Sequence, residues 1–290
     1  MRSPVSADLT GDFTREQFIA EFPCPAHKVE VFSTIDSTNA HLLRRAQPLQ
    51  PLLDEAGTPT ANGCAFDHTV AVASSQSAGR GRLGRTFYSP DASGVYFSIA
   101  LVPTGGVTDP APFTAAAAVG VCQAVEGLLG ELCLIKWVND IFLRGKKVCG
   151  ILSEGVANPQ TQRVEAVVVG VGINVLPSDS LPPDIKAKAG FLCDERLLRE
   201  RNISRMQVAA RCAKAILSQL DSPAHETVLG EYKRRSMLLG KTVTVHPVIG
   251  DRASFSAHVL DVADDFSLVV RLADGSQKRL HSGEVSLHED

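Results

Sequence analysis

The chain has 290 residues, of which 44% are hydrophobic and 21% are charged, and its formal net charge is -3. This length is enough for one large hydrophobic core and a smaller second one, so we expect two domains. The slightly acidic balance excludes a general attraction to nucleic acids or anionic membranes, and any anion-binding site has to be built locally.

Seven cysteines are scattered through the chain, and no two of them have the C-x-x-C spacing. This pattern favours reduced, buried thiols over disulfides or a zinc site and is typical of an intracellular protein. No apolar run approaches the roughly eighteen residues of a membrane span, and the N-terminus lacks a basic-then-apolar signal pattern. We therefore expect a cytoplasmic protein with no membrane and no nucleic-acid partner.

The first third of the chain predicts one helix and two strands. Residues 1–26 mix polar residues with three prolines and predict an extension that lies on the surface. Ser37 and its polar neighbours precede the run AHLLRRA, in the cap-then-apolar order of a helix start. Residues 47–68 are rich in Pro, Gly and Thr and predict a long loop. Two apolar, β-rich runs at 69–76 and 94–103 predict strands.

The middle of the chain predicts a buried helix followed by strands. An Ala-rich run between Asp109 and Gly130 is apolar around most of its circumference, which predicts a buried helix with a proline near its start. Three strands are expected in LCLIKWVNDIFLRG, KKVCGILSEGV and EAVVVGVGINV, the first two joined by a tight hairpin at residues 144–146. Amphipathic helices are expected at 204–221 and 225–237.

The pattern changes at Gly240. Short alternating segments separated by Gly and Asp turns follow, as is typical of a small antiparallel barrel of about fifty residues. We therefore expect an N-terminal extension at 1–26, a large domain at 27–239 and a small domain at 240–290.

The run SSQSAGRGRLGRTFYSP (74–90) sets three arginines among three glycines between two predicted strands. Glycine lets the backbone approach a ligand closely, and arginine presents a fork of donors that matches carboxylate and phosphate oxygens. The alternation predicts a mobile anion clamp. A solvated turn is the alternative interpretation, and the acidic net charge disfavours binding of single-stranded nucleic acid through Phe87 and Tyr88.

Two later segments carry polar residues or glycine in apolar surroundings. Lys136 and Asp140 are expected on one strand, and each is at least as compatible with a surface or turn position as with chemistry. Lys147 begins a buried strand close to a glycine, which predicts an anion contact. Gly170 and Gly172 interrupt another buried strand, where glycine indicates close packing against the backbone or a bulge.

Taken in chain order, these segments resemble the biotin protein ligase family. The matching runs are Ser37-Thr38-Asn39, Gln76, Gly79-Arg80-Gly81-Arg82-Leu83-Gly84-Arg85, Lys136-Trp137-Val138-Asn139-Asp140, Lys147-Val148-Cys149-Gly150-Ile151-Leu152 and Gly172-Ile173-Asn174. The resemblance covers residues 29–290, and SGEVSL (282–287) is similar to the family's final strand. Val138 stands where the family usually has proline and Phe87 where tryptophan is common, and neither change removes a charged group.

The resemblance implies an α+β fold, with a mixed, largely antiparallel sheet like that of class II tRNA synthetases and a C-terminal SH3-like barrel. It also implies a ligase that uses ATP and Mg²⁺. Biotin's carboxylate attacks the α-phosphate of ATP to give biotinyl-5′-AMP, and a lysine in the biotin-acceptor domain of a carboxylase then takes the biotinyl group. Cations have to stand between the two reacting anions.

The resemblance also assigns site residues by their positions in these runs. The catalytic residues are Arg82 and Lys147. The biotin-binding residues are Ser37, Thr38, Asn39, Gln76, Gly79, Arg80, Gly81, Arg82, Lys147 and Gly150. The ATP- and adenylate-binding residues are Arg82, Arg85, Phe87, Asn139, Asp140, Ile173 and Asn174. No metal ligand is assigned, and the two loop arginines Arg80 and Arg82 are expected to hold carboxylate and phosphate oxygens as the loop closes over the adenylate.

Two other functions stay open. A lipoate or octanoate ligase-like enzyme shares the acyl-adenylate chemistry but would have an apolar tube in place of the Ser-Thr-Asn run and Gln76. A catalytically silent biotin- and nucleotide-binding module is disfavoured because every charged motif residue is present. The segment before residue 27 is too short for the DNA-binding domain of the family's repressors, so we expect no repressor activity, and both a monomer and a weak homodimer are compatible with the sequence.

Overall fold

Two β-sheets organise the protein. The computed structural model describes residues 13–221, 225–247, 253–281 and 284–287. A seven-stranded sheet has the order β1-β2-β3-β7-β6-β5-β4, and a five-stranded sheet has the order β11-β10-β9-β8-β12. Among the strand pairs of the described residues, β1 with β2 is parallel and the others are antiparallel. The predicted α+β class with a mixed, largely antiparallel sheet is confirmed.

The chain forms twelve strands and eight α-helices within the described residues. The large sheet consists of β1 (Val29–Ile35), β2 (Val70–Gln76), β3 (Gly94–Leu101), β4 (Leu134–Lys136), β5 (Asp140–Leu143), β6 (Lys146–Ala157) and β7 (Val164–Asn174). The small sheet consists of β8 (Thr242–His246), β9 (Phe255–Val262), β10 (Leu268–Arg271), β11 (Gln277–Leu280) and β12 (Glu284–Leu287). The α-helices are α1 (Arg15–Glu21), α2 (Thr38–Ala46), α3 (Ala61–Phe66), α4 (Ala111–Leu129), α5 (Pro183–Lys188), α6 (Glu195–Glu200), α7 (Arg205–Asp221) and α8 (His225–Arg235). The final strand expected at 282–287 is β12, and residues 282–283 lie outside the described part.

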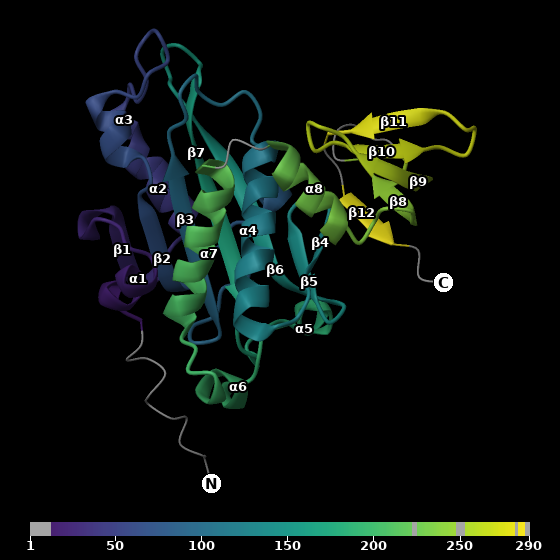
Figure 1. Cartoon of the computed structure of the whole chain (residues 1–290), viewed down its shortest axis with the longest axis horizontal. Coiled ribbons are helices and arrows are strands. Elements are labelled where there is room, and N and C mark those ends of the chain that lie inside the picture. Colours follow the sequence, from purple (N-terminus) through teal and green to yellow (C-terminus); the bar gives the residue numbers. More distant parts are fainter. Residues whose placement is uncertain (1–12, 222–224, 248–252, 282–283, 288–290) are drawn as a thin grey trace.

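Helices α4 and α7 cover one face of the large sheet (Figure 1). Gly120 lets the two helices touch, because a Cβ there would lie 2.7 Å from the backbone nitrogen of Ile216. The buried helix expected from the sequence is therefore confirmed. Its length and apolar composition do meet the criteria for a membrane span, contrary to the expectation that no segment comes near them. However, 67% of the 18-residue stretch of α4 that meets these criteria is buried inside the protein, so α4 is a core helix.

The other face of the sheet carries a second, smaller core under α2. Leu42 of α2 packs with Ala71 and Val168 of the sheet. Strands β3 and β7 serve both cores, because successive side chains of a strand point to opposite faces. The predicted helix start is confirmed, since the Ser37 hydroxyl caps α2 by accepting a hydrogen bond from the backbone N–H of Ala40 at 3.4 Å.

The expectation of a surface extension is wrong for residues 15–21. These residues form α1, which packs against α7, and Phe18 is fully buried in the main core. Glu21 at the end of α1 contacts Arg211 of α7 at 2.9 Å. Residues 1–12 lie outside the described part of the chain.

Local structure departs from the sequence prediction in three places. The segment 47–68 contains a short helix, α3. The carbonyls of Cys64 and Ala65 near its end, and that of Asp67 just beyond it, accept hydrogen bonds of 2.6 to 2.9 Å from the Lys28 ammonium. The single strand expected across 132–145 is divided into β4 and β5 by a turn at 137–139. Helices α5 and α6 were not expected, because six residues are too few for a helical period to be recognised. The hairpin at 144–146 is present between β5 and β6.

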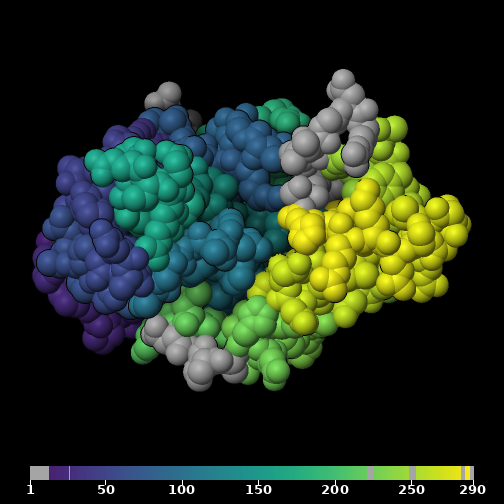
Figure 2. Space-filling view, turned by 90° about the horizontal axis from the view of Figure 1, so that it is seen from above, coloured from purple at the N-terminus to yellow at the C-terminus, as the bar shows by residue number. Residues whose placement is uncertain are grey.

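The five-stranded sheet forms a lobe beside the large sheet, drawn in yellow in Figures 1 and 2. The Trp137 indole N–H donates to the Phe266 carbonyl of this lobe at 2.8 Å, and the Tyr232 hydroxyl donates to the Val138 carbonyl at 3.0 Å. Burial raises the pKa of Tyr232 well above its ordinary value, so the hydroxyl keeps its proton. The turn at 137–139 is therefore held by the C-terminal lobe and by α8.

The cysteines agree with the sequence prediction. All seven are free, and five of them are buried. Burial raises the pKa of the Cys193 thiol to about 11, which keeps it protonated and unreactive at neutral pH.

We predict that Phe18→Ala destabilises the protein by about 3–5 kcal/mol, because it removes a fully buried ring from the main core. The matched control is Phe191→Ala, since that ring is 40% exposed and its loss costs about 1 kcal/mol or less. Urea unfolding measures both variants. Equal free energies of unfolding for the two variants would show that α1 is not part of the core.

Candidate functional site

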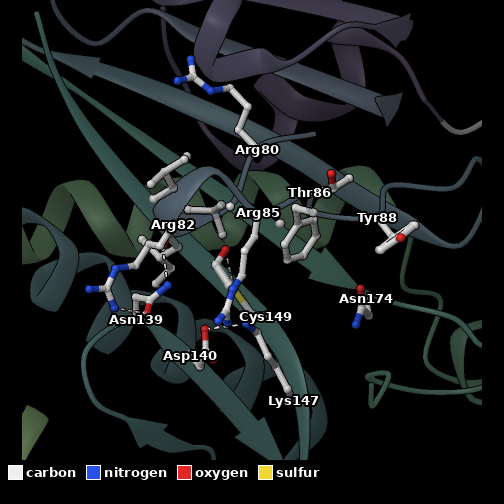
Figure 3. Close-up of a pocket in the computed structure, with 18 of the residues that line it drawn as sticks. Arg80, Arg82, Arg85, Thr86, Tyr88, Asn139, Asp140, Lys147, Cys149 and Asn174 are labelled. Atoms are coloured by element: carbon white, nitrogen blue, oxygen red, sulfur yellow. Dashed lines mark hydrogen bonds and ion pairs between the residues drawn. The ribbon is translucent and has the colours of Figure 1, made fainter. Parts of the chain in front are cut away.

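A cavity of about 380 Å³ opens on the α2 side of the large sheet. The first turn of α2, the Arg/Gly loop between β2 and β3, the inner strands β6 and β7, and the segment around α5 enclose it. Figure 3 shows residues that line it, with those of the Arg/Gly loop and of the strands β5, β6 and β7 among the labelled ones. Its walls come from segments far apart in the chain, as is usual for a small-molecule site.

The floor of the cavity is a strip of sheet without side chains. Gly172 of β7 pairs with Gly150 of β6, and Gly170 lies two residues along on the same face. A Cβ at Gly172 would lie 2.4 Å from the Phe87 ring, and one at Gly170 would lie 2.0 Å from Oδ1 of Asn39. The register of β6 with β7 is unbroken here, so close packing, and not a bulge, explains these glycines.

Neutral hydrogen-bonding groups form one wall, at the N-terminus of α2. The Thr38 backbone N–H donates to Oε1 of Gln76 at 2.9 Å, and Nε2 of Gln76 donates to the Ser89 hydroxyl at 2.9 Å. The buried Ser98 hydroxyl donates to Oδ1 of Asn39 at 2.6 Å and lies 2.7 Å from the Thr38 hydroxyl. Because protein partners orient these groups, the wall is already arranged before a ligand arrives.

Positive side chains gather at the opposite end of the cavity. Nζ of Lys147 contacts a carboxylate oxygen of Asp140 at 2.6 Å, and Arg82 donates to Oδ1 of Asn139 at 3.1 Å. Figure 3 shows Arg85 on the same side as these groups. The Lys147 side chain is 36% exposed, so it can reach a bound anion.

A β-bulge brings Lys147 into the cavity. The register of β5 with β6 shifts at Val148, which is left without a partner between Lys147 and Cys149. Val148 and Cys149 are both buried in the main core, as two consecutive residues at a bulge can be. The shift in alternation puts Lys147 on the same face as Gly150.

Arg80 does not join this cluster. Its guanidinium contacts Glu154 at 2.8 Å, and Figure 3 shows it pointing away from Arg82, Arg85 and Lys147. Arg80 and Arg82 therefore lie at different ends of the cavity and do not form the single anion clamp that the sequence predicts.

The cavity brings together most of the residues expected from the sequence. Those that line it are Ser37, Thr38, Asn39, Gln76, Arg80, Gly81, Arg82, Arg85, Phe87, Asn139, Asp140, Lys147, Gly150 and Asn174. Gly79 and Ile173 are not among the lining residues. Gly79 is packed inside the loop, where a Cβ would lie 2.3 Å from the Phe87 carbonyl, and Ile173 points to the main core on the opposite face of β7.

One wall of the cavity has no counterpart in the sequence prediction. It consists of residues in and around α5, namely Leu181, Ile185, Lys188 and Ala189. The backbone N–H of Gly190 donates to the Lys147 carbonyl at 2.6 Å, and Asn174 donates to the Gly190 carbonyl at 3.0 Å. These bonds hold the wall against β6 and β7, and no local pattern in the sequence points to them. Thr86 and Tyr88 also line the cavity without having been assigned to it.

No group of three or more His, Cys, Asp or Glu side chains that could hold a metal occurs within the described ranges. The Asp140 carboxylate and the amide oxygens of Asn139 and Asn174 line the cavity. These oxygen donors fit Mg²⁺ that arrives with phosphate groups, because that ion needs only one or two protein carboxylates in such sites.

Residues 65–174 match the Biotin/lipoate A/B protein ligase family. The bifunctional ligase/repressor BirA of Bacillus spizizenii is 41% identical over 127 residues, which are 43% of this chain and 38% of that protein. A biotin–[acetyl-CoA-carboxylase] ligase of Mycobacterium tuberculosis is 30% identical over 224 residues, which are 75% of this chain and 74% of that protein.

A similar solved structure is a biotin protein ligase from Aquifex aeolicus in complex with biotin and ATP. It superposes with a TM-score of 0.66 at 24% sequence identity, covering 90% of this chain and 99% of that one. This likeness concerns the fold. The chain aligns with well under half of the Bacillus protein and with most of the Mycobacterium protein.

We predict that Gly170→Ala destabilises the protein by about 2 kcal/mol or more, because the new Cβ displaces the buried Asn39 amide from its hydrogen bonds. Gly127→Ala is the control, since no atom lies within 4 Å of a Cβ at that position in α4 and alanine favours a helix by up to about 1 kcal/mol. Chemical denaturation of both variants gives the two free energies. Equal stability of Gly170→Ala and the parent would contradict the close packing.

Proposed function

This chain belongs to the biotin protein ligase family, and from that premise we propose that it is an ATP-dependent ligase. It joins biotin to AMP and then transfers the biotinyl group to a lysine in the biotin-acceptor domain of a carboxylase. One observation carries the proposal: a neutral hydrogen-bonding wall and a cationic end share one cavity. Biotin has a neutral head and an anionic tail, so it matches both ends.

The neutral wall suits the ureido ring of biotin. We assign Ser37, Thr38, Asn39 and Gln76 to this end, because hydroxyl and amide groups complement a neutral ring that both donates and accepts hydrogen bonds. Their orientation is set by neighbours such as Ser98, so binding requires little rearrangement. The glycine floor lets the Phe87 ring and the Asn39 amide pack directly against the sheet backbone.

The cationic end suits the first chemical step. A carboxylate oxygen of biotin forms a bond to the α-phosphorus of ATP, the bond from that phosphorus to the oxygen bridging to the β-phosphorus breaks, and pyrophosphate leaves. Arg82 and Lys147 hold the two anions together and stabilise the charge that develops on the phosphoryl oxygens. Lys147 is well placed for this because its contact with Asp140 orients the side chain in the ligand-free protein.

The second step needs no nucleophile from the enzyme. The acceptor lysine, as a neutral amine, attacks the acyl carbon of biotinyl-AMP, the bond from that carbon to the AMP oxygen breaks, and the nitrogen loses a proton. Closure of the Arg/Gly loop protects the anhydride from water until the acceptor arrives.

The adenylate occupies the side of the cavity next to the loop. Arg85 and Phe87 flank it, and the aromatic ring offers a face for stacking. Asn139, Asp140 and Asn174 bind ATP and would hold its Mg²⁺, which neutralises phosphate charge when bound.

Three further features belong to the proposal. The boundary between the ligase domain and the C-terminal domain lies at Leu239/Gly240, and the five-stranded sheet is an SH3-like barrel. The large sheet is related to that of class II tRNA synthetases. The protein works in the cytoplasm, in keeping with its seven free cysteines. It is a monomer or a weak homodimer.

Incubation of the protein with ATP, Mg²⁺ and a biotin-acceptor domain tests the function. With biotin, we expect the acceptor mass to rise by one biotinyl group on a single lysine, and AMP and pyrophosphate to form. With lipoate or octanoate in place of biotin, we expect no transfer. Transfer of lipoate alone would identify a lipoate ligase, and no transfer with any acid would identify a silent binding module.

We expect Lys147→Ala and Arg82→Ala each to lower kcat/KM for adenylate formation by about 10²–10³-fold, because each removes a cation from the transition state. Biotin-dependent exchange of pyrophosphate into ATP measures this step without the acceptor. Lys146→Ala is the control, since Lys146 is exposed and does not line the cavity. Parental exchange by either test variant would exclude that residue from catalysis.

A further inference from the structure

A carboxylate that neither the sequence patterns nor the cavity lining identifies joins two walls of the site. Glu154 of β6 is 19% exposed and lies behind the cavity surface. One of its oxygens contacts Nη2 of Arg80 at 2.8 Å, and the other accepts a hydrogen bond from Nδ2 of Asn39 at 2.8 Å. We name these contacts the Arg80–Glu154–Asn39 bridge.

The Asn39 end of the bridge is rigid. Its side chain is 4% exposed, and its amide nitrogen donates to both the Leu152 carbonyl, at 3.1 Å, and Glu154. Its amide oxygen accepts from the buried Ser98 hydroxyl. Turning the amide over would set its oxygen against two acceptors, so the orientation is fixed, and both amide hydrogens are used within the protein.

The Arg80 end of the bridge belongs to the loop. Two backbone hydrogen bonds close the loop on itself: Gly81 donates to the Arg85 carbonyl at 2.7 Å, and Phe87 donates to the Gly79 carbonyl at 2.9 Å. Beyond these bonds, the Arg80 side chain ties the start of the loop to β6. Because Glu154 neutralises its charge, Arg80 is not available as an anion clamp in this state.

We propose that Glu154 is a positioning residue that holds the Arg/Gly loop against the neutral wall of the cavity. Asn39 anchors the carboxylate, the carboxylate anchors Arg80, and the loop is thereby kept over the site. Asn39 thus acts mainly through Glu154, and Arg80 acts as a tether, while Arg82 and Lys147 handle the substrate anions. The link to biotin affinity rests on the proposed ligase function, whereas the tether itself does not.

The first test is hydrogen exchange of the ligand-free protein. Glu154→Gln keeps the shape of the side chain and an oxygen for Asn39 but removes the charge that holds Arg80. We expect the amides of Gly81 and Phe87 to exchange about tenfold faster, which corresponds to about 1.4 kcal/mol. Arg80→Met removes the same ion pair by changing the other residue, whose side chain is half-exposed, and should increase the exchange rate equally. This variant tests the tether even if Glu154→Gln does not fold.

Controls separate the tether from a general effect of charge. Glu195→Gln removes an exposed pair with Arg199 on α6 and should leave loop exchange at the parental rate. In the Arg80→Met background, Glu154→Gln should add nothing further. Loop exchange within about twofold of the parent in Glu154→Gln, or a full additional effect in the double variant, would overturn the proposal.

The second test uses the ligase assay. We expect Glu154→Gln to raise KM for biotin by about tenfold and to leave kcat for adenylate formation within about twofold, because the loop spends more time open but the reacting groups are intact. A lower kcat with unchanged KM would assign Glu154 to catalysis and contradict a positioning role. If the parent does not ligate biotin at all, the proposed function fails, and the exchange measurement still decides whether the tether exists.

Discussion

The site depends on the absence of three side chains from the middle of the large sheet. Gly150, Gly170 and Gly172 lie next to one another on β6 and β7, where any Cβ would meet Phe87 or Asn39 or narrow the space above them. Glycine in a central strand costs stability. The opposite face of β7 offsets that cost, because Val169 and Ile173 are buried under the helices in the main core. One strand thus supplies core packing on one face and, on the other, room for Phe87 and Asn39 to line the cavity.

Charge is the second constraint. A half-buried cluster of cations would repel itself and resist desolvation if it stood alone. In the ligand-free protein each end has its own carboxylate: Asp140 for Lys147 and Glu154 for Arg80. An anion that enters at the Lys147 end competes with Asp140 for the lysine ammonium. The slightly acidic chain can therefore keep a strongly basic loop folded over its cavity.

The C-terminal sheet supports the site from behind. The turn at 137–139 carries Asn139, which bonds both Arg82 and the Ile151 carbonyl. The buried Trp137 and Tyr232 fix that turn against Phe266, in the turn between β9 and β10. The position of Asn139 in the cavity consequently depends on contacts with a part of the chain more than a hundred residues further on.

The sequence by itself determined the features that arise among near neighbours. The Ser37 cap, the buried helix that ends at Gly130, the hairpin before β6 and the alternation of arginine with glycine all follow from groups within a few residues of one another. It also determined which segments bear chemistry, because charge and glycine in apolar strands are visible as residue types.

Only the tertiary structure decided where these groups point and what they meet. The register shift at Val148 turns Lys147 into the cavity, the pairing of β7 sends Ile173 to the core, and α5 closes a wall that no periodicity marks. Folding also buries Phe18. It pairs Arg80 with Glu154 instead of placing Arg80 at the anion-binding end of the cavity. The physical reason is that strand register and side-chain packing decide which residues meet across sheets and loops. Both depend on how segments far apart in the sequence pack together, and not on the residue types within one segment.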